Sequence, residues 1–150
     1  MQKIKEELYQ LCTGFINERI QNAEEALKQA QQASTDDTKS SAGDKYETGR
    51  EMAQQDINRN MQLLADAQQQ KALLLALNTN ATPDVIKNGT LVLTNNGNFY
   101  LSISAGQFTV KGVSYFALSP VAPLGKLLMG KRKGDDFTFN QRNYQIKELI

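Results

Sequence analysis

The stretch IKEELYQLCTGFINERIQNAEEALKQA, residues 4–30, decides the fold of this 150-residue chain. Its apolar side chains recur at steps of three and four residues, which is the spacing of one face of an α-helix. They are Ile4, Leu8, Leu11 and Phe15, followed with a displacement of one place by Ile16, Ile20, Ala23, Leu27 and Ala30. The spacing predicts one amphipathic helix over about residues 2–32.

A second apolar stripe with the same period predicts another helix, over about residues 45–77. It consists of Ala53, Ile57, Met61, Leu64, Ala67, Lys71 and Leu75, with Lys71 contributing its aliphatic stem. The Thr82-Pro83 step and the polar residues before it end the pattern. Two long helices with one narrow stripe each bury it best against each other. We therefore expect an antiparallel coiled-coil hairpin in a domain of residues 1–80, with its tip at residues 34–51.

After residue 80 the pattern changes to short strands. The segments TLVLT (90–94) and NFYLSIS (98–104) flank Asn95-Asn96-Gly97, which predicts a β-hairpin. Further strands are expected at residues 107–110, 113–118, 137–139 and 143–149, and a short helix at residues 123–130. The predicted fold class is α+β, with the helical hairpin followed by a small antiparallel β-sheet domain that carries one short helix, over residues 81–150.

The composition excludes several classes of function. The chain has no histidine and a single cysteine, Cys12, which excludes a structural zinc site and a histidine-activated nucleophile. No apolar run is long enough to predict a membrane span, and the charged N-terminus does not resemble a secretory signal, so we expect a cytoplasmic location. Residues 1–80 carry 9 basic and 12 acidic side chains, whereas residues 81–150 carry 8 and 4. Opposite net charges indicate either two modules that meet different surfaces or ordinary solvated surface.

The segment QASTDDTKSSAGDKYETGREMA, residues 32–53, is unusually acidic for a connection between helices. Its carboxylates are Asp36, Asp37, Asp44, Glu47 and Glu51, with one tyrosine, Tyr46, among them. One interpretation is a hydrated loop whose acids cap the second helix and interact with its dipole. The other is half of a magnesium site, because Mg²⁺ is typically held by one or two carboxylates together with waters and substrate phosphates. In another protein's phosphate-handling centre, such a metal activates a water for attack on a phosphodiester.

The segment SPVAPLGKLLMGKRKGDDFTF, residues 119–139, resembles a pattern of the bacterial Gre transcript-cleavage factors. The shared features are Ser-Pro, a short helix, Leu-hydrophobic-Gly-Lys, Gly-Asp-acid and a strand, and YQIKELI is similar to the family's closing strand. The resemblance extends over nearly the whole chain in length and in the order of elements. It implies an N-terminal antiparallel coiled coil and a C-terminal FKBP-like domain.

The resemblance also implies which tip residues act. Asp37 and Lys39 fall on the family's Asp and Lys, whereas Ser40 stands where the family has its second functional acid. The substitutes for that acid are Asp36, Asp44 and Glu47. We therefore expect these four tip carboxylates to act in the polymerase active site, with Mg²⁺ shared by Asp37 and Asp44 only inside the polymerase complex. The chain is expected to have no cofactor of its own.

By the same resemblance, the C-terminal domain docks at the rim of the RNA polymerase secondary channel, and Ser119, Pro120 and Val121 contribute to docking. The alternative is that Pro120 and Pro123 only start the short helix. Lys126, Lys131, Arg132 and Lys133 form a basic cluster that faces RNA, acidic polymerase surface or solvent. The implied function is a monomeric, non-enzymatic elongation factor that stimulates the polymerase's own transcript cleavage in backtracked complexes and contacts nascent RNA indirectly.

Two other functions stay open. With Ser40 in place of an acid, the chain is alternatively a Gre-like regulator that occludes the channel without cleavage, as some relatives of the family do. The FKBP-like domain is alternatively a prolyl isomerase or peptide-binding module with a helical arm. Its aromatic candidates are Phe99, Tyr100, Phe108, Tyr115, Phe116, Phe137, Phe139 and Tyr144.

Overall fold

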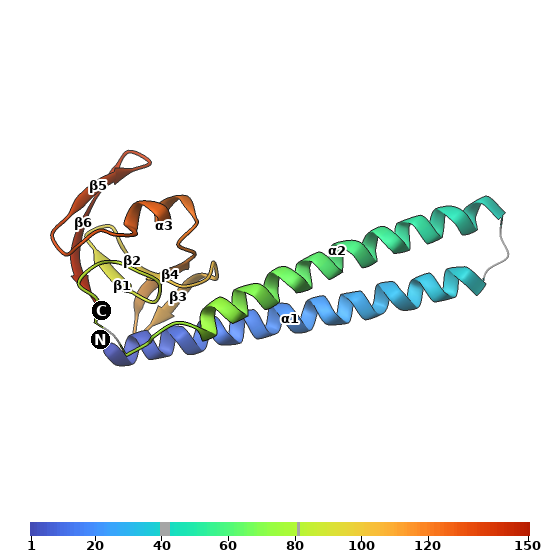
Figure 1. The fold of residues 1–150 in the computed structure, drawn as a ribbon, viewed down its shortest axis with the longest axis horizontal. Coiled ribbons are helices and arrows are strands. Elements are labelled where there is room, and N and C mark those ends of the chain that lie inside the picture. The colour runs from blue at the N-terminus through green and yellow to red at the C-terminus, as the bar shows by residue number, and fades with distance from the viewer. Residues whose placement is uncertain (40–42, 81) are drawn as a thin grey trace. The chain divides into compact units, whose positions relative to one another are not determined.

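The two long helices form as expected, but both extend further towards each other. The computed structural model describes residues 1–39, 43–80 and 82–150, with the side chains of residues 36–48 outside the described set. Helix α1 spans Gln2–Lys39 and α2 spans Gly43–Leu75, and they run side by side in opposite directions (Figure 1). Most of the tip expected at residues 34–51 is therefore helical in the part that the structure describes. Extending an existing helix adds one hydrogen bond per residue, which outweighs the modest helix propensities of Ser, Thr and Asp.

The chain divides into two compact units, Ile16–Lys71 and Met1–Phe15 with Ala72–Ile150. The first, the hairpin unit, contains only parts of α1 and α2. The second, the sheet unit, contains the beginning of α1, the end of α2 and all strands. No helix in the described part of the chain has both the length and the apolarity to cross a membrane.

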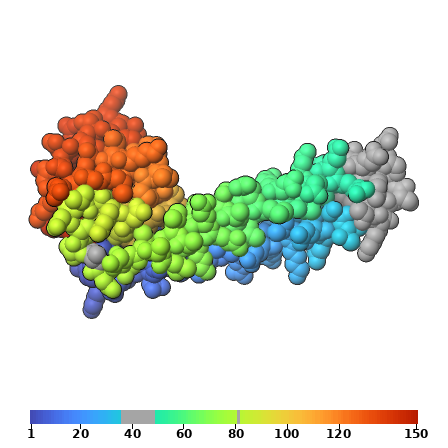
Figure 2. All heavy atoms as spheres, in the orientation of Figure 1, coloured from blue at the N-terminus to red at the C-terminus, as the bar shows by residue number. Residues whose placement is uncertain are grey.

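The hairpin unit packs through a seam with a seven-residue repeat. Ile16, Ala23 and Ala30 are buried on α1, and Ala53, Asn60 and Ala67 are buried on α2, each seven residues from the next. Half-buried side chains lie between them, with Ile20 and Leu27 on α1 and Ile57 and Leu64 on α2. This is the spacing of a coiled coil. On the face shown in Figure 2 the surfaces of the two helices meet along this unit without a gap.

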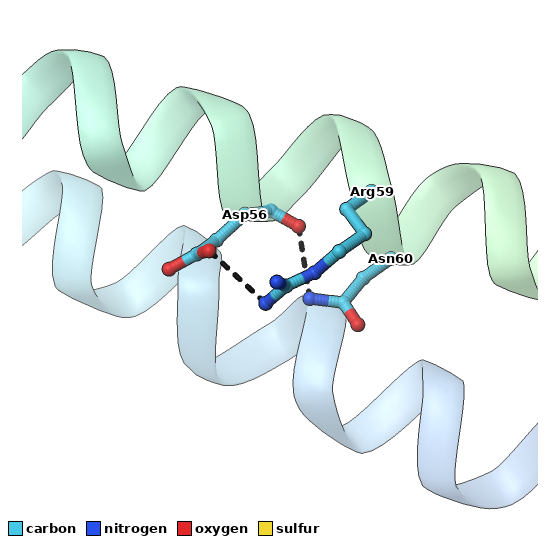
Figure 3. A network of polar contacts seen from close by, with 3 residues as sticks. All are labelled: Asp56, Arg59 and Asn60. Carbon is cyan, nitrogen blue, oxygen red and sulfur yellow. Dashed lines mark hydrogen bonds and ion pairs between the residues drawn. The ribbon is translucent and has the colours of Figure 1, made fainter.

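Three residues of the predicted stripes lie outside the core. Leu11, Met61 and Leu75 are exposed, and the adjacent Cys12, Asn60 and Leu74 are buried instead. Asn60 Nδ2 donates a hydrogen bond of 2.8 Å to the Asp56 carbonyl oxygen, and the Asp56 carboxylate pairs with Arg59 at 3.1 Å (Figure 3). Satisfying the Asn60 amide within its own helix allows a polar residue at a core position, which apolar periodicity alone does not reveal.

The sheet unit contains six strands in the order β3-β4-β2-β1-β6-β5. Their bounds are Leu91–Thr94 (β1), Gly97–Leu101 (β2), Gly106–Val110 (β3), Val113–Leu118 (β4), Asp136–Phe139 (β5) and Arg142–Leu149 (β6). Each predicted strand is present, although β2 ends at Leu101 and not at residue 104. Helix α3, Pro123–Leu128, follows β4 as predicted.

The sheet is mostly antiparallel, with one parallel pair that differs from the prediction. β2 pairs with β4 in parallel, Phe99 opposite Phe116 and Leu101 opposite Leu118. The chain leaves β2, forms β3 at the sheet edge and returns as β4 between β3 and β2. Strand alternation alone cannot separate this insertion from a simple meander, because both use the same side-chain pattern.

The sheet is covered on both faces within its unit. Phe99 and Leu101 pack in a core cluster with Leu128 of α3, and the neighbouring residues in β2 point to the other face. There, Ser102 Oγ lies 3.7 Å from Cys12 Sγ of α1, and Leu8 and Tyr100 are fully buried. The first turns of α1 are thus part of the sheet unit's core.

Candidate functional site

The predicted docking residues lie in the loop Ser119–Ala122, which connects β4 to α3. Helix α3 begins at Pro123, with Ala122 as its N-terminal cap in an extended conformation. Pro120 therefore lies before the helix, and Pro123 occupies the first helical turn, where its missing N–H group has no cost. The sequence leaves both prolines as candidates for starting the helix. In the structure only Pro123 starts it, and Pro120 belongs to the loop.

Three hydrogen bonds define the shape of this loop. Ser119 Oγ accepts from the backbone N–H of Val121 at 3.2 Å, and the Ser119 carbonyl oxygen accepts from Ala122 N–H at 3.0 Å. The Ser119 N–H donates to Ser104 Oγ at 3.3 Å. Local serine bonds of this kind stabilise tight turns. The loop therefore has a defined conformation that its own residues and Ser104 maintain.

The loop presents an apolar side chain to solvent. Val121 is 72% exposed, and Leu127 on α3 is 39% exposed. Pro123, Lys126 and Leu127 share the outer face of α3, whereas Leu124 and Leu128 face the core. The surface of this segment, orange in Figure 2, lies on the face drawn. Contiguous patches of exposed apolar residues are features of protein-binding surfaces, and Val121 and Leu127 are the exposed large apolar residues of this segment.

Gly125 lies directly against the loop. A Cβ atom added to Gly125 would approach the Ser119 carbonyl oxygen to 2.1 Å and Pro120 Cα to 3.0 Å. Sequence reasoning missed this residue, although a glycine inside a predicted helix is a signal for close backbone approach. Sequence reasoning also missed Ser104. Nothing in the residues around it predicts its hydrogen bond with Ser119, because the two residues are 15 positions apart in the chain.

The basic cluster is only partly available to a partner. Lys131 Nζ lies 5.5 Å from the centre of the Phe137 ring, and Lys133 Nζ pairs with Glu148 at 3.2 Å. The backbone N–H of Arg132 donates to the Asp135 carboxylate, which shapes the turn before β5. Lys126 lies on the outer face of α3, next to Leu127 in the chain. The side chains of Lys131 and Lys133 thus have contacts within the sheet unit.

The predicted tip carboxylates lie at the facing ends of the two helices. Asp36 and Asp37 belong to the last turn of α1, and Asp44 and Glu47 to the first two turns of α2. Their side chains lie outside the described residues. Among the side chains that are described, no group of three or more acidic or sulfur ligands could hold a metal ion.

Half of the eight aromatic candidates for an isomerase pocket are buried in the core. Phe99, Tyr100, Tyr115 and Tyr144 are at most 7% exposed. The Phe99 ring centre lies 6.1 Å from that of Tyr144, which in turn stacks on Phe137 at 5.1 Å. These rings hold the sheet unit together, and of the other candidates Phe116 is exposed.

Buried polar groups line the contact between α1 and the sheet. Burial raises the pKa of the Cys12 thiol to about 11, although its hydrogen bond with Ser102 opposes the shift. Burial also raises the pKa of the Tyr100 hydroxyl, which has no hydrogen-bond partner among the described residues. The pKa of Lys5 is lowered by burial and by the nearby charge of Lys87. Because all three residues are at most 1% exposed, they have no surface for chemistry with a partner.

The comparisons with known proteins give a distant structural similarity. No protein-family model matches the chain, and no curated protein matches it. A solved structure of the transcription factor Gfh1 is similar over 91% of this chain and 92% of its own, with 18% sequence identity and a TM-score of 0.39. The function of this chain therefore has to be inferred from its own residues.

Proposed function

We propose that the chain is a transcription elongation factor that binds RNA polymerase through the loop Ser119–Ala122 and acts through the carboxylates at the end of its helical hairpin. The resemblance of residues 119–139 to the Gre pattern supports the choice of partner. The loop's exposed Val121 supports docking at this position. In this proposal the hairpin enters the secondary channel and the polymerase, not this chain, is the enzyme.

The observation that carries the proposal is where the acids lie in the hairpin. α1 and α2 stay helical up to Lys39 and from Gly43, so Asp36, Asp37, Asp44 and Glu47 gather at one end of the hairpin unit. The helix from Ile16 to Lys39 is about 36 Å long at 1.5 Å per residue. A polar connection of ordinary length needs no helices that long, whereas delivery of carboxylates into a deep site does.

The carboxylates would supply ligands in a site that the polymerase completes. Carboxylate oxygens are the hard donors that Mg²⁺ takes, together with waters and phosphate oxygens. We assign Asp37 and Asp44 to this role, with Asp36 and Glu47 beside them. A metal held by these carboxylates would supply an activated water as the nucleophile.

The test replaces Asp36, Asp37, Asp44 and Glu47 together by alanine. We expect the variant to bind purified polymerase core as the wild type does and to lose stimulated cleavage of RNA in stalled complexes. A matched control replaces four exposed acids elsewhere in the hairpin unit, Glu18, Glu24, Glu25 and Asp66, and changes the net charge equally. Full stimulation by the tip variant would contradict the assigned role of the carboxylates.

A channel-occluding regulator is the second candidate, because Ser40 replaces an acid of the family pattern. In the same assay this function predicts slower RNA synthesis without shortened transcripts. The isomerase function has less support, since half of the eight aromatic candidates are buried. Turnover of a proline peptide above background would restore it.

A further inference from the structure

The local conformation of helix α3 does not explain why residue 125 is a glycine. Gly125 has no positive φ, so its backbone conformation is open to any residue. In a helix, glycine is about 1 kcal/mol less favourable than alanine. An alanine at position 125 would thus stabilise helix α3. The backbone of Ser119 and Pro120 leaves no space for its Cβ atom.

The excluded atoms are backbone atoms, which cannot rotate away as a side chain can. An alanine Cβ would overlap the Ser119 carbonyl oxygen at 2.1 Å and press on the Ser119 carbonyl carbon at 3.1 Å. That same oxygen accepts the hydrogen bond from Ala122 N–H, which closes the loop. Moving Ser119 therefore disturbs the bond that fixes the loop around Val121.

We propose that Gly125 is a positioning residue that holds the loop Ser119–Ala122 in its binding conformation, with Ser104 supporting the loop through its hydroxyl. This inference rests on the proposed docking function of Val121. A loop already in its bound conformation has less freedom to lose when the complex forms, and so binds more tightly. Gly125 acts through its close packing against the backbone of Ser119 and Pro120, and Ser104 acts through its hydrogen bond with the Ser119 N–H.

The first experiment compares Gly125→Ala with Gly14→Ala in the full chain. Gly14 is also helical, but a Cβ there meets no atom within 4 Å. For Gly125→Ala we expect affinity for the polymerase core to fall about tenfold, the size of effect that loss of preorganisation produces. We also expect faster amide hydrogen exchange at Val121 and Ala122 in the free protein. Gly14→Ala should change neither.

The second experiment covers the case in which Gly125→Ala does not fold. Ser104→Ala removes the acceptor for Ser119 N–H, whereas Ser104→Thr keeps a hydroxyl. Ser104 is exposed, so neither change opens a cavity. We expect about threefold weaker binding and faster exchange for Ser104→Ala, and recovery of both by Ser104→Thr. Unchanged binding and exchange in Gly125→Ala or, where that variant is unfolded, in Ser104→Ala would overturn the inference.

A third variant separates this inference from the function on which it depends. Val121→Ser leaves the loop's backbone bonds in place and removes its exposed apolar contact. If Val121→Ser binds more weakly while the Gly125 and Ser104 variants bind normally, the positioning role of Gly125 is refuted and the docking role of the loop is not. Unchanged binding of Val121→Ser would instead refute docking at this loop.

Discussion

Cys12 is a core residue whose environment makes its thiol unreactive. It is fully buried on α1, 3.7 Å from Ser102 Oγ, and burial raises its pKa to about 11. Thiolates, not thiols, react with alkylating agents and metals. The single cysteine of the chain is therefore a structural residue at neutral pH.

The raised pKa of Cys12 predicts a loss of stability in alkaline solution. The unfolded thiol loses its proton from about pH 9, whereas the native thiol keeps it until about pH 11. The unfolded state thus binds fewer protons, and the free energy of unfolding falls as pH rises between these values, by on the order of 2 kcal/mol.

Denaturant titrations of the wild type and Cys12→Ser at pH 8 and pH 11 measure this effect. The difference between the two proteins reports the Cys12 thiol together with its effect on the Tyr100 hydroxyl, whose pKa the charge of Cys12 also raises. It separates Cys12 from Lys5, whose lowered pKa acts in the opposite direction. An equal pH dependence in both proteins would show that Cys12 is not the cause.

At this scale the sequence predicts the stripes well and errs by single positions. Leu11 and Cys12 are neighbours that both fit a helical period, and Cys12 is the one that faces the sheet. The choice depends on contacts with Ser102, 90 residues later in the chain. Periodicity within one helix contains no information about such a contact.

Among the elements, the hairpin seam has mainly small residues at its fully buried positions. Ala23, Ala30, Ala53 and Ala67 occupy four of them, and Asn60 occupies another. Small side chains let two helices approach closely, but each buries little apolar area. A buried asparagine in a coiled coil fixes the register at a cost in stability. The seam therefore defines the register of the two helices but contributes little hydrophobic stabilisation.

Replacing Asn60 by leucine should stabilise the hairpin unit by roughly 1 kcal/mol, because an apolar side chain takes the place of a buried amide. The loss of its bond to the Asp56 carbonyl oxygen leaves an acceptor that the helix already satisfies. Thermal unfolding followed by circular dichroism measures the change. Asn58→Leu, an exposed position on the same helix, is the control and should stay within about 0.5 kcal/mol of the wild type. If Asn60→Leu destabilises the hairpin unit while Asn58→Leu does not, the Asn60 amide contributes net stability.

The helix ends show where element prediction fails. Polar residues of low helix propensity led us to end the first helix near residue 32 and begin the second near residue 45, yet α1 reaches Lys39 and α2 begins at Gly43. Nucleation is the costly step of helix formation, and the seam has already nucleated both helices. Propensity at the end of a long helix therefore decides little.

For the whole molecule, the order of elements could be predicted from sequence, and the arrangement of the site only in part. Turn residues and strand alternation located every strand described, but not the parallel pairing of β2 with β4. The proposed docking loop could be located from Ser119 and Pro120, whereas the close approach of Gly125 to it is a tertiary contact. The roles of Asp36, Asp37, Asp44 and Glu47 stay predictions.

The central claim is that the acidic end of the hairpin reaches the polymerase catalytic centre. The most direct measurement places a photo-crosslinker on Thr38→Cys, with Asn88→Cys in the exposed part of the sheet unit as the control. Cys12 can stay in place because it is buried. In a stalled elongation complex we expect the probe at residue 38 to crosslink to the catalytic subunit near the RNA 3′ end, and the probe at residue 88 not to. Binding to polymerase with no crosslink from residue 38 to that region would contradict the account.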